Sequence, residues 1–316
     1  LLSDLISAYE RLNRDVWLER VNLTPSQRLE LKVLVEETDT DANRHYRYDY
    51  YRDNCSTRVR DALDKVLGGQ VRASTEHLDT GSTYRWHTAR LLRPVLTAYA
   101  GIQFVVGNRG DVPISAWEEM FLPLRMRDHL GNVRVSMPDG EEVSLLGPPL
   151  RMVEVSRPPP PVEAPTFLLF FLGAGFVLSG FFVIAGEAVA RGRRWAEWVL
   201  VTMGTAWSVT VGLLGTALVL SWFLTDHYYW GLNENVFQAN PFSLALAAVF
   251  LLAAFGRSRV VVVHLTLAVA ALSMGGLLLQ LLPGLDQVNG EVLALMLPAH
   301  LGLAWGVSRA WSSLPE

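Results

Sequence analysis

Hydrophobic residues are unevenly distributed along the 316-residue chain. Apolar runs dominate residues 166–311, whereas residues 1–157 carry most of the charged side chains. A membrane-spanning helix needs about 20 apolar residues to cross roughly 30 Å of hydrocarbon. The runs that meet or approach this length are residues 167–190, 198–224, 237–255, 260–282 and 292–311. The pattern therefore predicts an all-α bundle of five transmembrane helices over residues 166–316.

The arginines between the apolar runs favour five spans over four. Those at the ends of the runs are Arg191, Arg193, Arg194, Arg257, Arg259 and Arg309, whereas residues 225–240 and 283–291 contain no Lys or Arg. Cytoplasmic loops carry an excess of these residues. Five spans place all the arginine-bearing ends on one side. Four spans, without the short run at 241–255, would split them. We therefore expect the N-terminal part outside the cytoplasm and the C-terminus inside it.

The polar half, residues 1–155, has the patterns of helices and one hairpin, and residues 156–165 form a proline-rich linker. The predicted elements are a helix over residues 3–20, a helix capped by Thr24 with Pro25 and Gln27 in its first turn, a helix from Asn54 or Cys55, a helix from residue 82 or 83 to 92, a helix capped by Ser115 that stops before Gly131, and a hairpin within residues 133–146. Because the sequence starts LLSDL without a signal peptide, we expect this extracytoplasmic domain to be N-terminally incomplete.

Cys55 is the only cysteine of the chain, so it cannot form an intrachain disulfide. One interpretation is a small buried hydrophobic residue, which free cysteines often are. The other is a nucleophile, because free N–H groups and the dipole at a helix start favour a thiolate. Cys55 lies among polar residues and precedes the apolar stripe that we expect to begin at Val59.

Several segments resemble one known family. Asn54, Cys55, Thr57 and Arg60-Asp61, within YDYYRDNCSTRVRDAL, match the Asn-Cys-Ser/Ala-Thr-x-x-Arg-Asp motif of the Lnb N-terminal periplasmic domain family. The segments STYRWHTARLL, GIQFVVGNRGDVPISAWEEMFLPLRMRDHL and TDHYYWGLNENVFQANP resemble its further motifs. The resemblance implies an α+β papain-like (NlpC-like) thiol domain facing the periplasm of the bacterial inner membrane.

The same resemblance implies a reaction and its partners. In the best-understood members, a fatty acyl chain moves from a phospholipid donor to the N-terminal amine of a lipoprotein acceptor. We expect Cys55 to be the nucleophile, with Asn54, Thr57 and Arg58 shaping the site or holding a phosphate. The alternatives are a cysteine hydrolase, such as a cell-wall amidase or lipid deacylase, and a non-catalytic membrane-anchored binding module. No cofactor is implied, and no basic patch indicates a nucleic acid partner.

The identity of the general base stays open. The family carries a Gly-His segment before its cysteine, but the only histidine before Cys55 is His45. His87 lies in a tryptophan-containing helix and is a second candidate. His77 and His129 have the sequence context of surface or helix-end residues, and His264 and His300 that of neutral histidines within spans. The sequence contains no HExxH, HxxxH or CxxC motif, so no metal site is predicted.

A polar loop follows the second apolar run and holds the remaining candidate residues: Asp226, His227, Asn233 and Asn235. One interpretation is an interfacial aromatic belt, supplied by Tyr228, Tyr229 and Trp230, with turn-forming asparagines. The other is a site at the level of the lipid headgroups that faces the thiol domain.

Overall fold

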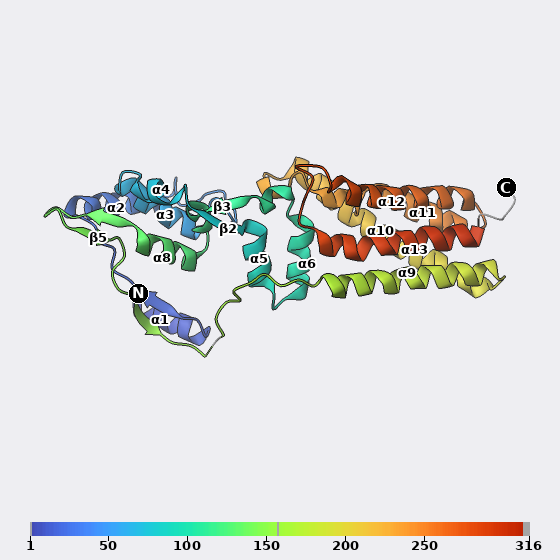
Figure 1. Cartoon of the computed structure of the whole chain (residues 1–316), viewed down its shortest axis with the longest axis horizontal. Helices are drawn as coiled ribbons and strands as arrows, with labels where there is room; N and C mark the ends of the chain where they lie inside the picture. The colour runs from blue at the N-terminus through green and yellow to red at the C-terminus, as the bar shows by residue number, and fades with distance from the viewer. Residues whose placement is uncertain (1, 157, 312–316) are drawn as a thin grey trace. The chain divides into compact units, whose positions relative to one another are not determined.

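The computed structural model describes residues 2–156 and 158–311 (Figure 1). Contacts divide the chain into two compact units. The cysteine unit consists of Leu1–Tyr84 and Pro113–Pro161, and the membrane unit consists of Arg85–Val112 and Val162–Glu316. The boundaries expected from the sequence, 1–155, 156–165 and 166–316, stay predictions. The contacts nevertheless group residues 85–112 with the apolar helices.

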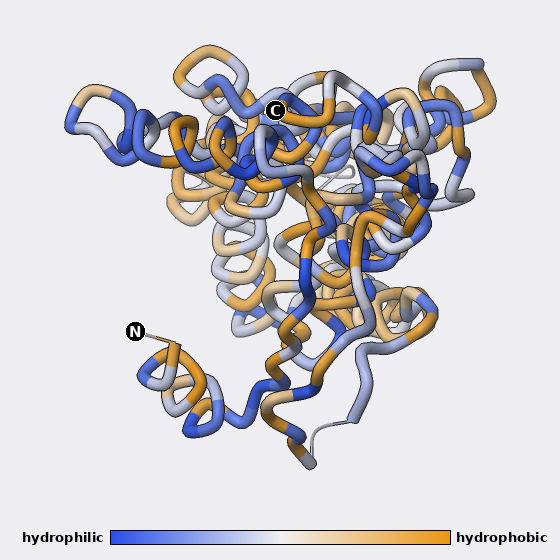
Figure 2. Tube along the Cα trace, turned by 90° about the vertical axis from the view of Figure 1, so that its left-hand side faces the viewer, coloured by the Kyte–Doolittle hydropathy of each residue, from blue (hydrophilic) through white to orange (hydrophobic). Residues whose placement is uncertain are grey.

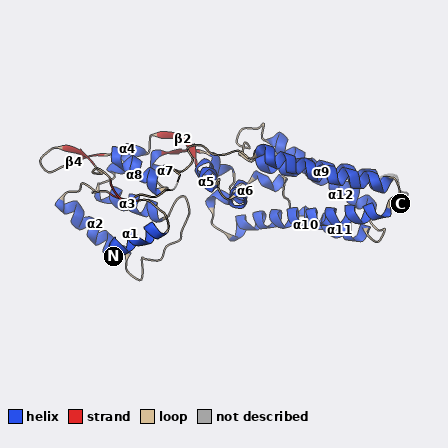
Figure 3. Ribbon diagram, turned by 90° about the horizontal axis from the view of Figure 1, so that it is seen from below, coloured by secondary structure: helices blue, strands red, loops and turns tan. Residues whose placement is uncertain are grey.

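The cysteine unit is mostly helical and has only small sheets (Figure 3). Its helices are α1 (Leu2–Arg11), α2 (Pro25–Thr38), α3 (Cys55–Val66), α4 (Gln70–Thr75), α7 (Ala116–Glu119) and α8 (Pro123–Asn132). The described residues form three antiparallel pairs: β1 (Val16–Leu18) with β6 (Leu150–Val153), β2 (Asp79–Thr83) with β3 (Pro113–Ser115), and β4 (Arg134–Ser136) with β5 (Glu142–Ser144). A papain-like arrangement of these elements stays a prediction.

The local signals for caps and turns are confirmed. Thr24 caps α2 in a capping box with Gln27, and α3 begins at Cys55 after the N-cap Asn54. Ser115 and Glu118 form a second capping box at α7. The predicted hairpin is β4–β5. The helix starts depend on side chains within three residues of the helix end, which is why the sequence alone reveals them.

Two predicted helices are wrong in their extent. The helix expected over residues 3–20 ends at Arg11, because Asn13 adopts a φ of 52° and Trp17 pairs with Arg151 in the β1–β6 ladder. Along α1, hydrophobic and hydrophilic residues alternate (Figure 2). The helix expected from Ser115 to Gly131 is interrupted, because α7 ends at Glu119 and Pro123 starts α8.

The core of the cysteine unit contains one face of α3. The buried cluster is Leu23, Leu63, Val66, Leu67, Val71, Met120, Leu130, Val133, Val135 and Leu145. Val59, expected to start the apolar stripe, is instead 49% exposed. The first turns of α3 bury Ser56, Thr57 and Arg60. The inward face of α3 is therefore polar near Cys55 and apolar toward its C-terminal end.

Among the described residues of the membrane unit, five helices are long and apolar enough to span a bilayer, as predicted. They are α9 (Leu168–Ala190), α10 (Arg194–Leu224), α11 (Phe242–Ala253) with the preceding 3-10 turn η3 (Glu234–Phe237), α12 (Arg259–Leu279) and α13 (Gly290–Trp311). They run side by side (Figures 1 and 3). The unit also contains α5 (Tyr84–Leu92) from Arg85 onward, α6 (Leu96–Val105), η1 (Asn108–Asp111) and η2 (Tyr228–Trp230). The helix α6 was not predicted.

Small residues let α9 and α13 approach closely. A methyl group added at Gly186 of α9 would overlap the backbone of Gly306 in α13, and one added at Gly306 would overlap the carbonyl of Phe182. Gly302 approaches Ser179 in the same way. Glycine seams of this kind allow backbone packing between membrane helices, where lipid supplies little hydrophobic driving force for association.

The seam gives a paired prediction. Gly186→Val should lower the free energy of unfolding by about 1–3 kcal/mol, because the side chain is forced against backbone that cannot move aside. Gly180→Val, on the same helix, places its side chain in open space and is the matched control. Thermal unfolding in detergent measures both. Equal stability of the two variants would contradict close backbone packing between α9 and α13 at Gly186.

Candidate functional site

The thiol of Cys55 lies at the first residue of α3 and is exposed and free. Its exposure contradicts the interpretation of a small buried hydrophobic residue. The side chain shares the outward face of α3 with Val59 and Arg58, which are also exposed. A reagent or substrate in solution can therefore reach the sulfur in the structure of this unit.

Asn54 fixes the backbone on which Cys55 sits. Its side-chain oxygen accepts hydrogen bonds from the backbone N–H groups of Ser56 (2.8 Å) and Thr57 (2.9 Å). Its amide nitrogen donates to the carbonyls of Tyr50 (2.8 Å) and Phe121 (3.0 Å). The Thr57 hydroxyl completes the cap by accepting from the Asn54 N–H at 2.7 Å. Both side chains are buried and serve to position the cysteine.

The same cap uses most of the backbone N–H groups at the start of α3. Two of the first-turn N–H groups, at Ser56 and Thr57, already donate to Asn54. The Arg58 N–H donates to the Asn54 carbonyl. Among the described residues, the N–H of Cys55 itself is the first-turn donor that has no recorded acceptor. The helix start therefore offers one backbone donor to a developing negative charge, and any second donor must come from outside the first turn of α3.

Arg58 is tied to its neighbours on the exposed side of α3. Its Nη2 donates to Asp53 at 2.7 Å, and its guanidinium carbon lies 4.0 Å from the centre of the Tyr46 ring. The hydrogen bond to Asp53 raises the pKa of Arg58, so the side chain stays charged. One nitrogen, Nη1, is left for a phosphate or carbonyl oxygen.

Tyr48 lies near the thiol, which the sequence did not predict. Burial raises the pKa of Tyr48, and the charge of Cys55 raises it further. The phenol therefore stays protonated at neutral pH and is able to donate a hydrogen bond. The tyrosine-rich segment YRYDYY before α3 could have indicated a tyrosine near the thiol. Tyrosines before a helix have no unique function, however, so the sequence alone does not identify Tyr48.

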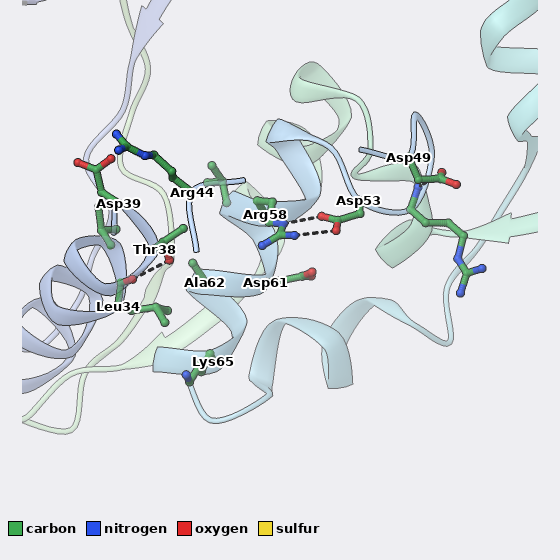
Figure 4. A pocket seen from close by; sticks show the side chains of 13 residues that line it. Leu34, Thr38, Asp39, Arg44, Asp49, Asp53, Arg58, Asp61, Ala62 and Lys65 are labelled. Carbon is green, nitrogen blue, oxygen red and sulfur yellow. Dashed lines mark hydrogen bonds and ion pairs between the residues drawn. The ribbon is translucent and has the colours of Figure 1, made fainter. Parts of the chain in front are cut away.

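A cavity of about 970 Å³ opens between α2 and α3 (Figure 4). Val59, one helical turn after Cys55, lines it, although Cys55 itself does not. The rest of the lining combines a few apolar side chains and Thr38 with charges of both signs: Leu34, Val35, Ala62, Thr38, Asp39, Arg44, Asp49, Arg52, Asp53, Arg58, Asp61 and Lys65. The cavity therefore offers charged groups to a polar or zwitterionic ligand beside apolar surface.

The histidines have different surroundings. His45 is exposed on the loop before α3. His87 is fully buried in the membrane unit, where its Nδ1 lies 3.3 Å from Arg90. His129 lies in the last turn of α8, as predicted, and its Nε2 lies 2.6 Å from the buried carboxylate of Glu119. Within the described residues, no histidine is hydrogen-bonded to Cys55.

The loop after α10 divides into exposed and buried residues. Asp226 and His227 are exposed, and the His227 ring lies 4.1 Å from that of Trp230. Asn233 and Asn235 are buried and donate to the last carbonyls of α6, at Gln103, Phe104 and Val105. The two asparagines thus satisfy helix-end carbonyls that would otherwise lack partners.

A buried ion pair holds the same region together. Arg85 bonds both oxygens of Asp111, at 2.6 and 3.0 Å, and also donates to the carbonyls of Val106 and Gly107. Asp111 in turn accepts from the N–H of Val288 at 3.0 Å. Both residues lie in segments that resemble the family's further motifs. In this chain they join residues 85–112 to the loop before α13.

The cap of α3 can be tested locally. Asn54→Ala should destabilise the first turn by about 1–2 kcal/mol, which raises hydrogen exchange of the Ser56 and Thr57 amides roughly five- to thirty-fold. Asn132→Ala, at an exposed position, is the control. Exchange measured by mass spectrometry on the whole protein gives both values. Unchanged exchange in Asn54→Ala would show that the cap does not hold the turn.

Comparison with known proteins agrees with the motifs. The family model of the Lnb N-terminal periplasmic domain matches residues 2–93, which include Cys55 and its neighbours. No curated protein and no solved structure is a significant match. Residues 2–93 are therefore similar to the Lnb N-terminal periplasmic domain, and the described part of the chain continues into five candidate membrane-spanning helices.

Proposed function

We propose that the protein is a cysteine-dependent acyltransferase of the bacterial inner membrane. It moves a fatty acyl chain from a phospholipid, through a thioester on Cys55, to the N-terminal amine of a lipoprotein. The observation that carries the proposal is the exposed thiol at the start of α3, within the family-matched segment, on backbone held by a buried cap. In this proposal the cysteine unit faces the periplasm and the C-terminus lies in the cytoplasm.

The reaction has two halves. The Cys55 thiolate attacks the ester carbonyl of the phospholipid, and the oxyanion forms near the Cys55 N–H. Collapse of this intermediate breaks the C–O bond, and the lysophospholipid leaves after it takes up a proton. The lipoprotein amine then attacks the thioester, forms the amide bond, loses a proton and releases the thiolate. A thioester suits this second half because it stays reactive toward amines.

The neighbouring residues have separate roles in this scheme. Asn54 and Thr57 position the cysteine, because their polar atoms are occupied by the cap. Arg58 and the Tyr48 hydroxyl are donors for the phosphate or the oxyanion. The base that takes the thiol proton stays open between His45, which lies in the cysteine unit, and a residue N-terminal to this sequence.

The loop after α10 supports the lipid side of the proposal. In this proposal the exposed residues Asp226 and His227 lie at the level of the lipid headgroups. Asn233 and Asn235 do not bind the lipid themselves in this proposal, because their side-chain amides donate hydrogen bonds to the carbonyls of α6.

A cysteine hydrolase is the second candidate, and one observation favours it. The cavity next to Val59 is lined mainly by charged side chains, as expected for a polar substrate such as a peptide. The hydrolase would share the first half-reaction and use water in place of the amine in the second half.

The transferase is tested in a host that lacks its own lipoprotein N-acyltransferase. The full-length protein should restore N-acylated lipoproteins, and Cys55→Ala should lower the rate by at least about 10³-fold, because it removes the nucleophile. Mass spectrometry of lipoprotein N-termini is the measurement, and Ser74→Ala, at a partly exposed position of α4, is the control.

Two outcomes would contradict the transferase. One is the absence of N-acylation although the unmutated protein is inserted in the membrane. The other is full N-acylation by Cys55→Ala. Release of free fatty acid or cleaved peptide that depends on Cys55, without N-acylation, would identify the hydrolase instead.

A further inference from the structure

Three acceptor oxygens converge on one amide nitrogen in the membrane unit. Asn108 Nδ2 lies 3.2 Å from Glu234 Oε1, 3.2 Å from the Gly284 carbonyl and 3.4 Å from Asp286 Oδ1. A side-chain amide has only two hydrogens to donate. At least one of the three oxygens is therefore not satisfied by Asn108, and two of them belong to carboxylates.

The carboxylate of Glu234 lacks a compensating charge. The residue is only 6% exposed, and its Oε2 has no hydrogen-bond partner. Within the ranges that the structure describes, neither Glu234 nor Asp286 has an ion-pair partner. Arg85 is not a partner for these carboxylates, because its guanidinium is shared between Asp111 and the carbonyls of Gln103, Val106 and Gly107. A buried carboxylate with an unpaired oxygen is costly unless a cation or a proton neutralises it.

We propose that this cluster is a binding site for a divalent cation, with Ca²⁺ the best fit. Glu234 and Asp286 supply two negative charges, and the Gly284 carbonyl supplies a third ligand. A 180° rotation of the Asn108 amide exchanges its nitrogen for Oδ1, which brings a fourth oxygen to the same point. Ca²⁺ accepts carboxylate, carbonyl and amide oxygens in flexible geometry, and water completes its shell.

The ligand types favour Ca²⁺ over other metals. The described residues contain no group of three His, Cys, Asp or Glu side chains that could hold a metal, which argues against a zinc-type site built from such side chains. Mg²⁺ demands near-ideal octahedral geometry, which three separate backbone segments do not readily supply. The sequence could not show this site, because its ligands lie at positions 108, 234, 284 and 286 and form no motif.

A cation there would link three segments of the membrane unit. Asn108 lies in η1, Glu234 begins η3, and Gly284 and Asp286 lie between α12 and α13. The Gln287 N–H already donates to Glu234 Oε1 at 3.3 Å, so two of these segments are in contact without metal. The bound ion would stabilise this arrangement. The inference does not depend on the chemistry at Cys55.

The test uses the full-length protein in detergent after treatment with EDTA. Added CaCl₂ should raise the midpoint of thermal unfolding, EDTA should reverse the shift, and isothermal titration with CaCl₂ should give a saturable site. Glu234→Gln and Asp286→Asn should each weaken Ca²⁺ binding at least tenfold. Asp139→Asn, at an exposed hairpin position in the cysteine unit, is the control and should bind as the unmutated protein does.

Each remaining outcome overturns the proposal. One is the absence of Ca²⁺ binding by the unmutated protein. Another is unchanged Ca²⁺ binding by Asp286→Asn. Because Asp286 is exposed, this variant should fold even where Glu234→Gln does not. An equal shift with ethanolamine hydrochloride would assign the cluster to an ammonium group. A stabilisation that follows pH but not Ca²⁺ would assign it to a protonated carboxyl group.

Discussion

The hydrogen bonds of one buried asparagine side chain are the constraint on which the candidate site depends. Asn54 accepts from two N–H groups of α3 and donates to carbonyls of Tyr50 and Phe121. All its side-chain capacity is used, so the site contains no unsatisfied amide that would favour another conformation. Because Phe121 lies between α7 and α8, the cap also connects the helix start to a distant segment. The Cys55 side chain is exposed, but hydrogen bonds of the preceding Asn54 fix the backbone around it.

Polar contacts play a comparable part in the membrane unit. Arg85 and Asp111 form an ion pair with side chains 2% and 10% exposed, and Arg85 also binds helix-end carbonyls. Asn233 and Asn235 bind the carbonyls at the end of α6. Residues 85–112 therefore belong structurally with helices that come more than fifty residues later. The family-like motifs in these segments contain residues that pack within the membrane unit. The motif around Cys55 instead contains the residues that position the thiol.

The sequence predicted the features that local rules control. The caps at Thr24 and Ser115, the start of α3 at Cys55 and the five apolar helices are confirmed. The pairing of β1 with β6, the helix α6 and the His129–Glu119 pair depend on residues far apart or on tertiary packing. Val59 shows the reason most clearly. Its spacing from Leu63 fits a core stripe, but Arg60 fills the inward position by packing on Trp117 at 3.9 Å. Val59 is consequently left outside.

The central claim is that Cys55 carries the acyl group during turnover. The direct measurement is mass spectrometry of the intact protein and its peptides after incubation with a defined phospholipid and no amine acceptor. The account predicts one acyl adduct, on the peptide that contains Cys55, which neutral hydroxylamine removes and a lipoprotein amine discharges. An enzyme that turns over without any adduct on Cys55, or that carries the acyl group on another residue, would contradict the account.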